Sequence, residues 1–333
     1  MRLLNVARTW IAMVGLTAGL TAGVAAQAQA PAFPSKPLTL TVAWPAGGAS
    51  DFIARVLAKE MSASLGQNII INNVPGASGS LGTSKAMNAP ADGYTLMLSS
   101  PIELILSPLI FASATYKPED ARAIMIVGRS NLMLVARKDL PASNPAELIA
   151  LMKANGGRPL TYCTPGIGSL YHLVGEHLNA AVGVKSLHVP YTGFPQCLND
   201  LAGGTIDFAF LPVAAPFTGF VDNASIKAMA VLGSEPSHRF PGLPLASATR
   251  GLEDFSFSIW AGLHVHAKVS DAVAEVLNRH ANAVLANPEV RKVIEQSGAV
   301  VSPPQTLQQA QAEYLDEIQR YTGIAKAVGL QKQ

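Results

Sequence analysis

The chain has 333 residues, of which 24 are basic and 22 are acidic, so its formal net charge at pH 7 is +2 and only 14% of its residues are charged. This balance argues against a nucleic-acid-binding protein, because such proteins need a basic face that neutralises phosphates. A chain of this length can form two globular lobes with a large buried core.

A secretory signal peptide is predicted for residues 1–30. Met1-Arg2 and Arg8 supply a basic start, Trp10 to Ala26 is an almost uncharged apolar run, and Ala26-Gln27-Ala28-Gln29-Ala30 offers overlapping A-x-A cleavage sites. The alternative is a retained membrane anchor, for which this run is only weakly apolar. Export would place the protein in an oxidising compartment.

The turn Trp44-Pro45-Ala46-Gly47-Gly48-Ala49-Ser50-Asp51 is the most informative stretch of the sequence. It joins an apolar strand, Leu38 to Ala43, to a helix predicted over Ser50 to Leu65. Its glycines let the backbone turn and let a ligand approach, and Ser50 or Asp51 can cap the helix. Because unpaired amides at a helix N-terminus favour a carboxylate or a phosphate, the turn is a candidate anion receptor. The alternative is an ordinary capped turn.

Strands and helices continue to alternate after this turn, which predicts an α/β fold with a mainly parallel first sheet. Ile69 to Val74 is a predicted strand, the glycine-rich Pro75 to Gly82 opens a helix to about Met87, and Tyr94 to Leu98 is a third strand. The glycine-rich segment matches no phosphate-binding motif. Ser99 and Ser100 follow the third strand, and ligands collect at such strand ends, so both are candidate contacts.

The second half of the chain repeats the strand, turn and helix pattern. Leu160 to Cys163 leads through Thr164-Pro165-Gly166-Ile167-Gly168-Ser169 into a helix predicted over Ser169 to Leu178. This helix N-terminus is a second candidate anion site, with His172 either within reach of it or packed at the surface. The other predicted elements are the strands Ala123 to Val127, Leu132 to Ala136, Ser186 to Pro190, Ile206 to Leu211, Ile226 to Leu232 and Ser256 to Val265, and the helices Asn144 to Ala154, one ending at Leu201, Ala272 to Leu285 and Thr306 to Val328.

Other chemistries have weaker support. A secreted hydrolase would use Ser50 or Ser169 as nucleophile and His172 as base, but the sequence has no G-x-S-x-G elbow and no nearby His-Asp pattern. The histidines lack metal-ligand spacing, so neither a metal nor another cofactor is expected. Cys163 and Cys197 can form a disulfide or remain two buried thiols, and their spacing does not decide between these.

A series of short motifs spans the chain beyond residue 30: Pro34-Ser35-Lys36-Pro37, the Trp44 to Asp51 turn, Gly66-Gln67, Asn73-Val74-Pro75-Gly76-Ala77, Asp92-Gly93-Tyr94-Thr95-Leu96, Gly166-Ile167-Gly168-Ser169 with His172-Leu173, His188-Val189-Pro190-Tyr191, Trp260-Ala261-Gly262-Leu263 and Asn287-Pro288-Glu289-Val290. Each motif is weak alone. In this order they resemble the Bug receptors, the TctC-like extracytoplasmic solute-binding proteins of tripartite tricarboxylate transporters.

The resemblance implies a type II periplasmic-binding-protein fold, in which two α/β lobes joined by crossing strands close on a solute. It implies that residues 31–126 and 235–333 form lobe 1 and residues 127–234 form lobe 2, with the chain crossing near Ile126 to Ala136 and near Ala228 to Ser234. It also implies a periplasmic monomer without a cofactor, which binds a small organic anion and serves either the membrane subunits of a transporter or a sensor protein. Carried over by position, the ligand contacts are Ala46, Gly47, Gly48, Ser50 and Asp51 in lobe 1, and Gly166, Gly168, Ser169 and His172 in lobe 2.

The sequence departs from the family at positions that bear on specificity. Trp44 stands where phenylalanine is commoner, Phe194 occupies a turn where small residues are usual, and Leu211-Pro212-Val213 is apolar where a polar residue often follows the strand. Together with Thr192 as a further contact, these residues indicate a mono- or dicarboxylate with an apolar or aromatic body, unless they pack inside the lobes. Asp51 would repel an anion, so we expect it to cap its helix, or else to pair with an ammonium group of the solute.

Overall fold

A computed structural model of the chain describes residues 33–154, 158–296 and 298–327. The predicted signal peptide lies outside the described residues. The strands are β1 Leu38–Val42, β2 Ile69–Asn73, β3 Thr95–Ser99, β4 Ala121–Arg137, β5 Thr161–Thr164, β6 Leu187–Pro190, β7 Phe208–Pro212, β8 Ile226–Leu232, β9 Ser258–His266 and β10 Val300–Val301. The helices are α1 Ala49–Leu65, α2 Ser80–Met87, α3 Ser107–Ile110, α4 Pro145–Ala154, α5 Leu170–Val182, α6 Phe194–Ala202, α7 Phe217–Asp222, α8 Asp271–Ala286, α9 Pro288–Gln296 and α10 Leu307–Ala327. Within the described ranges, every helix is too short or too polar to cross a lipid bilayer.

Two sets of strands build the sheet. In the first set β1 pairs parallel with β2 and with β3, and β9 joins β3 antiparallel. In the second set β5 pairs parallel with both β6 and β7. Parallel pairing follows from the sequence because a helix carries the chain back between successive strands.

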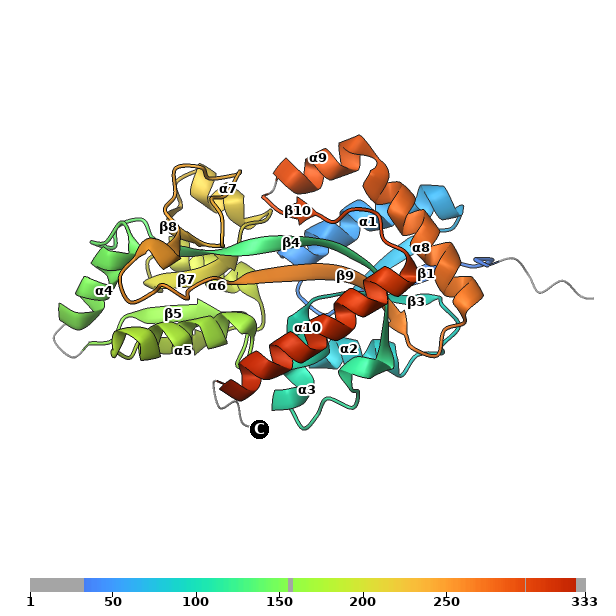
Figure 1. Cartoon of the computed structure of the whole chain (residues 1–333), viewed down its shortest axis with the longest axis horizontal. Coiled ribbons are helices and arrows are strands. Elements are labelled where there is room, and N and C mark those ends of the chain that lie inside the picture. Colours follow the sequence, from blue (N-terminus) through green and yellow to red (C-terminus); the bar gives the residue numbers. More distant parts are fainter. Residues whose placement is uncertain (1–32, 155–157, 297, 328–333) are drawn as a thin grey trace, which may run out of the picture. The chain divides into compact units, whose positions relative to one another are not determined.

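Strand β4 belongs to both sets. Ala121 to Asn131 pair with β9, and the rest of the strand pairs with β7 and β8. Figure 1 shows β4 and β9 running side by side as long ribbons between the two groups of helices. The molecule therefore has two α/β lobes joined by crossing strands.

The sequence suggested two strands where the structure has one, because Gly128 and the polar residues after it look like a break. The pairing with β9 shifts its register between Ile126 and Gly128 and then resumes, so the strand does not end there. Glycine is required at this point, since a Cβ on Gly128 would lie 2.5 Å from the carbonyl oxygen of Val300 in β10.

Helix α1 forms as its sequence predicts. Ile53, Leu57 and Met61 recur at helical spacing and are buried. The helix ends at Gly66, whose left-handed conformation (φ +67°) satisfies the usual requirement of a C-terminal cap. The turn before α1 is thereby attached to a rigid element.

Apart from the two-residue strand β10 and three single 3-10 turns, the elements that were not predicted are a π-helical turn over Ile102–Leu106, α3, α7 and α9. The first two lie in a nearly continuous apolar stretch that has no helical periodicity to read. Helix α7 has six residues and α9 has nine, so each offers few turns of pattern. All except α3 contribute a residue to the pocket described below.

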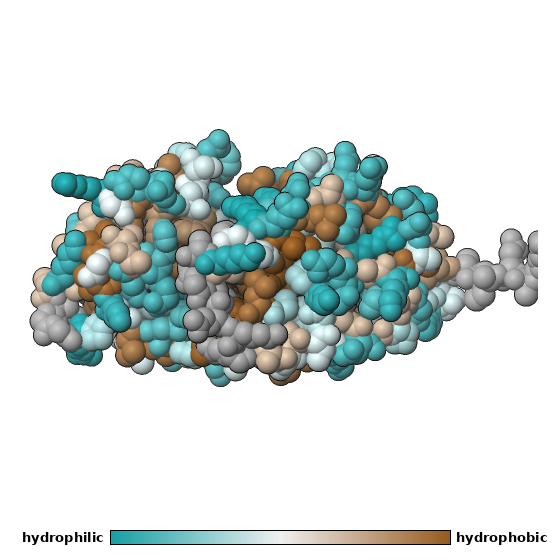
Figure 2. Space-filling model, turned by 60° about the horizontal axis from the view of Figure 1, so that its bottom comes forward, coloured by the Kyte–Doolittle hydropathy of each residue, from teal (hydrophilic) through white to brown (hydrophobic). Residues whose placement is uncertain are grey.

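Most of the apolar sequence is buried. Figure 2 shows one face of the molecule on which hydrophilic side chains predominate and hydrophobic ones gather near the middle. The large hydrophobic side chains that remain exposed come from separate elements and include Ile70 in β2, Leu187 in β6 and Leu315 in α10. The 49% hydrophobic content of the chain is therefore used mainly for the cores of the two lobes.

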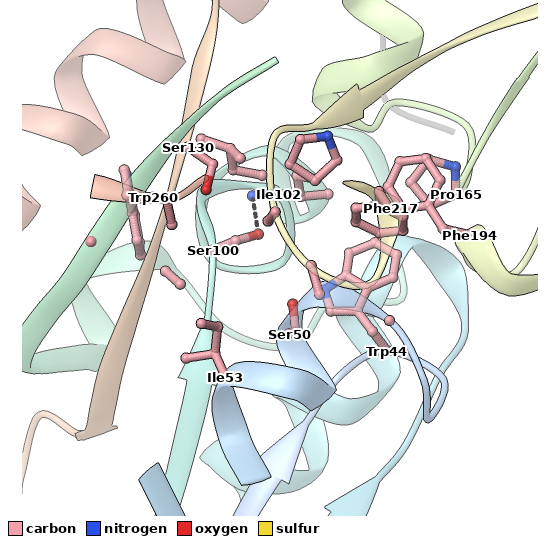
Figure 3. A pocket seen from close by; sticks show the side chains of 18 of the residues that line it. Trp44, Ser50, Ile53, Ser100, Ile102, Ser130, Pro165, Phe194, Phe217 and Trp260 are labelled. Atoms are coloured by element: carbon pink, nitrogen blue, oxygen red, sulfur yellow. Dashed lines mark hydrogen bonds between the residues drawn. The ribbon is translucent and has the colours of Figure 1, made fainter. Parts of the chain in front are cut away.

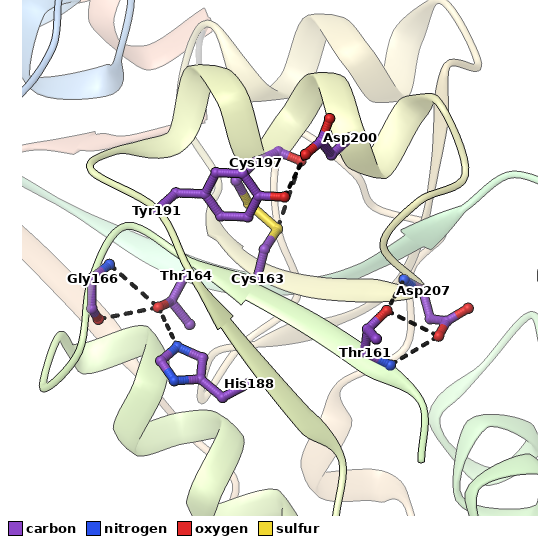
Figure 4. Close-up of a disulfide and its surroundings, with 9 residues drawn as sticks. All are labelled: Thr161, Cys163, Thr164, Gly166, His188, Tyr191, Cys197, Asp200 and Asp207. Atoms are coloured by element: carbon purple, nitrogen blue, oxygen red, sulfur yellow. Dashed lines mark hydrogen bonds between the residues drawn. A yellow bond between two sulfur atoms is a disulfide. The ribbon is translucent and has the colours of Figure 1, made fainter. Parts of the chain in front are cut away.

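A disulfide joins Cys163 at the end of β5 to Cys197 in α6 (Figure 4), with the two Cα atoms 5.8 Å apart. Both residues are fully buried. The sequence left the pairing open, because only the fold brings residues 34 positions apart into contact. The disulfide fastens α6, whose first residue Phe194 reaches the pocket, to strand β5 of the same lobe.

We predict that the double variant Cys163→Ala, Cys197→Ala unfolds more easily than the oxidised wild type. Closing a loop of 34 residues restricts the unfolded chain and stabilises the fold by about 3 to 4 kcal/mol. Urea unfolding followed by circular dichroism measures the difference. The control is reduced wild type, which should lose a similar amount, whereas unchanged midpoints in both proteins would contradict the prediction.

Candidate functional site

A pocket lies where the two lobes face each other, and eight segments of the chain line it. Its space, with the solvent at the mouth included, is about 830 Å³, which suits a small molecule. The first lobe contributes the turn before α1, the end of β3, β9 and the region around α9. The other walls come from the middle of β4, the turn before α5, the start of α6 and the segment after β7.

Aromatic rings dominate the walls. In Figure 3 the ring of Trp260 lies on one side of the pocket, and the rings of Trp44 and Phe217 lie on the other. Phe194 packs edge to face against both Tyr171 and Phe217, with ring centroids 4.7 and 5.0 Å apart. Such pairs hold each ring in one orientation, so this wall is rigid and apolar.

The polar side chains of the lining are hydroxyls. Ser50, Ser100 and Ser130 lie between the aromatic rings in Figure 3, and Tyr171 also lines the pocket. Among the described residues, no lining side chain carries a formal charge, and no group of three or more His, Cys, Asp or Glu side chains could hold a metal ion. An ionic ligand must therefore be bound by hydrogen bonds.

The N-terminus of α1 supplies such hydrogen-bond donors. Gly48, Ala49 and Ser50 line the pocket, and the first helical bond runs from the Phe52 amide to the Gly48 carbonyl, at 3.0 Å. The amides of Ala49, Ser50 and Asp51 precede that bond, and no acceptor for them is found in the described part of the chain. This end of a 17-residue helix therefore presents free donors and positive potential to the pocket.

Asp51 does not line the pocket but anchors the turn from behind. Its buried carboxylate accepts hydrogen bonds from the Gly47 amide at 2.9 Å, from Arg55 at 2.8 and 3.1 Å and from Asn73 at 3.1 Å. Burial opposes ionisation, but the bonds from Arg55, Gly47 and Asn73 outweigh it and lower the pKa of Asp51. These contacts make Asp51 structural, but the expected cap is wrong: the N-cap of α1 is Gly48, and neither Ser50 nor Asp51 caps the helix with its side chain.

The second glycine turn differs in part, because several of its donors are bonded within the turn, whereas the Leu170 and Tyr171 amides at the start of α5 have no acceptor among the described residues. The Gly168 amide donates to His172 Nδ1 at 3.0 Å, the Gly166 amide donates to Thr164 Oγ1 at 3.3 Å, and Ser169 caps α5 by accepting from the His172 amide at 3.3 Å. The pocket is lined instead by Pro165 and Tyr171 from this region.

His172 is neutral and packed rather than free. Its ring stacks on that of His188 with centroids 4.0 Å apart, and burial lowers the pKa of both histidines. The His188 ring in turn bonds the Thr164 hydroxyl (Figure 4).

The fourteen residues predicted as ligand contacts thus fall into two groups. The lining includes Trp44, Gly48, Ser50, Ser100 and Phe194. The other residues lie outside it: Ala46, Gly47, Asp51, Ser99, Gly166, Gly168, Ser169, His172 and Thr192. For the second group, contact with a ligand stays a prediction.

Glu103 is the polar residue at this site that sequence reasoning missed. It lies in the π-helical turn, is fully buried, and accepts hydrogen bonds from the Ser100 amide and hydroxyl, both at 2.6 Å, and from Trp44 Nε1 at 3.1 Å. Burial raises the pKa of Glu103 to about 7, against the opposing effect of these donors. The available signal was an acidic residue inside the apolar run Ile102-Glu103-Leu104-Ile105.

Trp260 is held in a similar way on the opposite wall. Its Nε1 donates to Glu317 at 3.2 Å, and Glu317 also binds Arg129 at 2.8 Å. Both tryptophans of the pocket therefore direct their N–H groups toward glutamates and away from the pocket. A ligand meets the faces of the two rings.

Comparisons with known proteins agree with this architecture. Residues 53–330 match the family model TctC, described as "Tripartite tricarboxylate transporter family receptor". The chain is 32% identical to Protein BugT of Bordetella pertussis over 328 residues, which cover 96% of this chain and 97% of BugT.

Two solved structures share the fold over most of the chain. The periplasmic binding protein BugD is 28% identical, with a TM-score of 0.84, and the match covers 90% of this chain and 100% of BugD. The protein Rpa4515 of R. palustris, solved with adipate, is 26% identical, with a TM-score of 0.84 and the same two coverages. The predicted periplasmic-binding-protein fold is confirmed.

We predict that Glu103 makes the protein less stable as the pH rises. A carboxyl group whose pKa is raised from 4.5 to about 7 in the folded state favours folding below about pH 4.5, and this contribution is lost as the pH rises through 7. Relative to Glu103→Gln, the free energy of unfolding of the wild type should fall by about 3 kcal/mol between about pH 4 and about pH 8.

Urea unfolding at the two pH values measures this difference, because all other titrating groups are shared. Glu289→Gln, which alters an exposed carboxyl group of α9, is the matched control and should follow the wild type. Parallel pH profiles of wild type and Glu103→Gln would contradict the assignment.

Proposed function

Because the chain belongs to the family of tripartite tricarboxylate transporter receptors, we propose that it captures a small organic carboxylate in the periplasm and delivers it to the membrane subunits of such a transporter. Its relatives are receptors rather than enzymes. Ser169, a candidate nucleophile in the hydrolase alternative, is a helix cap here.

The observation that carries the proposal is the free N-terminus of α1 in the pocket wall. Hydrogen bonds from amides to a carboxylate are charge-assisted, and each contributes roughly 1.5 to 3 kcal/mol. Two or three of them can hold an anion without a basic side chain, and no basic side chain lines the pocket within the described residues. The adipate bound by Rpa4515 supports a carboxylate as the ligand group.

Closure of two lobes on the ligand is the proposed mechanism. We assign residues 31–126 and 235–333 to one lobe and residues 127–234 to the other, with β4 as the main crossing strand. Several contacts link the lobes thus defined, and two of them involve glycine-containing turns. Ser78 Oγ donates to the Ile167 carbonyl at 2.7 Å, and a Cβ on Gly193 would lie 2.6 Å from the Pro45 ring. These contacts support a closed form that shields the bound solute from water.

We predict that at least one carboxylate stabilises the exported protein in a thermal-shift screen of aliphatic, aromatic and amino-acid carboxylates. At a hundredfold excess over its dissociation constant, a one-site ligand adds about 2.7 kcal/mol, which gives a clear shift. Absence of a shift with every compound would contradict the proposal.

The variant Ala49→Pro tests the role of α1 directly. Proline is well tolerated at the first helical position but has no N–H, so the variant removes one free donor from the pocket. We expect the dissociation constant of the best carboxylate to rise about tenfold or more, measured by calorimetry. Ala49→Gly keeps the amide and is the matched control. Equal affinities of the two variants would show that the amide does not bind the ligand.

The variant Gly193→Ala tests closure of the two lobes. Gly193 has φ +172°, an extended conformation that any residue adopts, so Gly193→Ala should alter only the contact with Pro45. We expect weaker ligand binding by several-fold, because the closed form is strained, with little change in the stability of the ligand-free protein. Gly219→Ala, where a Cβ has nothing within 4 Å, is the control and should bind like the wild type. Equal affinities of both variants and the wild type would contradict closure through this contact.

A further inference from the structure

Resting on the proposed function, we infer that this receptor selects monocarboxylates with an apolar or aromatic body over dicarboxylates, and that Glu103 determines this selectivity. Its carboxylate occupies the hydrogen-bond donors of the pocket wall that could otherwise bind a second carboxylate of the ligand.

The donors around Glu103 have the arrangement of an anion site. One amide, one hydroxyl and one indole N–H converge on its two carboxylate oxygens, at distances of 2.6, 2.6 and 3.1 Å. All three donors belong to residues that line the pocket, Ser100 and Trp44. In a site for a dicarboxylate these donors would face the ligand, whereas here the chain supplies the acceptor itself.

Ser100 has no donor left for a ligand. Its hydroxyl donates to Glu103 and accepts from the Ile102 amide at 3.3 Å (Figure 3). The side chain of Trp260 on the facing wall is equally committed, since its indole N–H donates to Glu317. Away from α1, the pocket therefore presents ring faces and aliphatic groups together with the hydroxyls of Ser130 and Tyr171.

A second carboxylate in this space would lose its hydration without gaining a cation. No lining side chain among the described residues is basic, and no ion pair within those residues includes Glu103. Two tyrosines interact with Glu103 instead. The Tyr116 hydroxyl donates to the main-chain carbonyl of Glu103, and the charge of Glu103 contributes to raising the pKa of Tyr171. Burying a ligand carboxylate near Glu103 is therefore unfavourable for two reasons: the carboxylate loses its hydration, and the two negative charges repel each other.

The apolar walls complement the body of a monocarboxylate. With its carboxylate at the amides of α1, the rest of such a ligand would lie among Trp44, Phe217 and Trp260. Aromatic or aliphatic groups of a ligand can stack on these ring faces, and burying their apolar surface favours binding. The two ends of the pocket thus recognise opposite chemistries.

Matched ligand pairs test the inference on the wild type. Hexanoate and adipate differ by one carboxylate, as do benzoate and terephthalate, and isothermal titration calorimetry compares the members of each pair. We expect at least one monocarboxylate to bind more tightly than its dicarboxylate partner by about tenfold or more. A dicarboxylate that binds as tightly as its partner, or more tightly, in both pairs overturns the inference but leaves the proposed function intact. If none of the four binds and the broader carboxylate screen is also silent, both are overturned.

Variants of Glu103 test its role. Glu103→Ala frees all three donors, so its ratio of adipate to hexanoate affinity should rise about tenfold or more over the wild-type ratio. Glu103→Gln keeps the shape of the side chain and removes its negative charge, so it should raise the adipate-to-hexanoate ratio by a smaller factor. If the Glu103→Ala protein does not fold, Glu103→Gln takes its place in the test. Tyr116→Phe removes a contact with the Glu103 main chain and leaves the carboxylate in place, so it is the matched control and should keep the wild-type ratio. An unchanged ratio in the Glu103 variants overturns the assignment.

Discussion

The continuous pairing of β4 is the constraint on which the rest of the structure depends. This strand is 17 residues long and forms ladder bonds with β9 in its first part and with β7 and β8 in its last part. These bonds keep the two lobes joined with their strand ends toward each other, while register shifts near Ile126 and Leu134 let the strand bend. Val127, Gly128 and Ser130 from its middle line the pocket. The element that joins the lobes is thus also part of the site.

Three buried carboxylates stand behind the pocket walls and determine what the walls present. Asp51 holds the turn before α1, Glu103 holds Ser100 and Trp44, and Glu317 holds Trp260. Asp51 and Glu317 each have an arginine partner, whereas in the described chain Glu103 has only neutral donors. This difference explains why the pKa of Asp51 is lowered while that of Glu103 is raised. Ser100 and the indoles of Trp44 and Trp260 therefore spend their hydrogen bonds on glutamates, and the rings present mainly their faces to the ligand.

Local sequence patterns were sufficient for most of the fold. The apolar spacing of α1, the glycine that ends it and the alternation of strand and helix each depend on nearby residues, and the structure has these elements within a few positions of their predicted limits. The family resemblance added the two-lobed arrangement, which local patterns do not contain. The unpredicted elements are short or lie in uniformly apolar sequence, where periodicity gives no information.

The site was predicted less well, for a physical reason. A glycine turn before a helix looks the same in sequence whether its amides are free, as at Ala49 and Ser50, or already bonded, as at Gly168. The difference depends on His172, whose ring position is a property of the folded chain. Glu103 and Phe217 reach the site through segments that carry no motif, so only packing in three dimensions reveals them.

The placement of the tryptophans has a practical consequence. The chain contains three, of which Trp10 belongs to the predicted signal peptide, and the other two are Trp44 and Trp260. Both line the pocket, and both indole N–H groups are bonded to glutamates. In a protein that begins after the predicted leader, the tryptophan fluorescence arises only from these two rings. Emission intensity and wavelength therefore report directly on the occupancy of the pocket, without an attached dye.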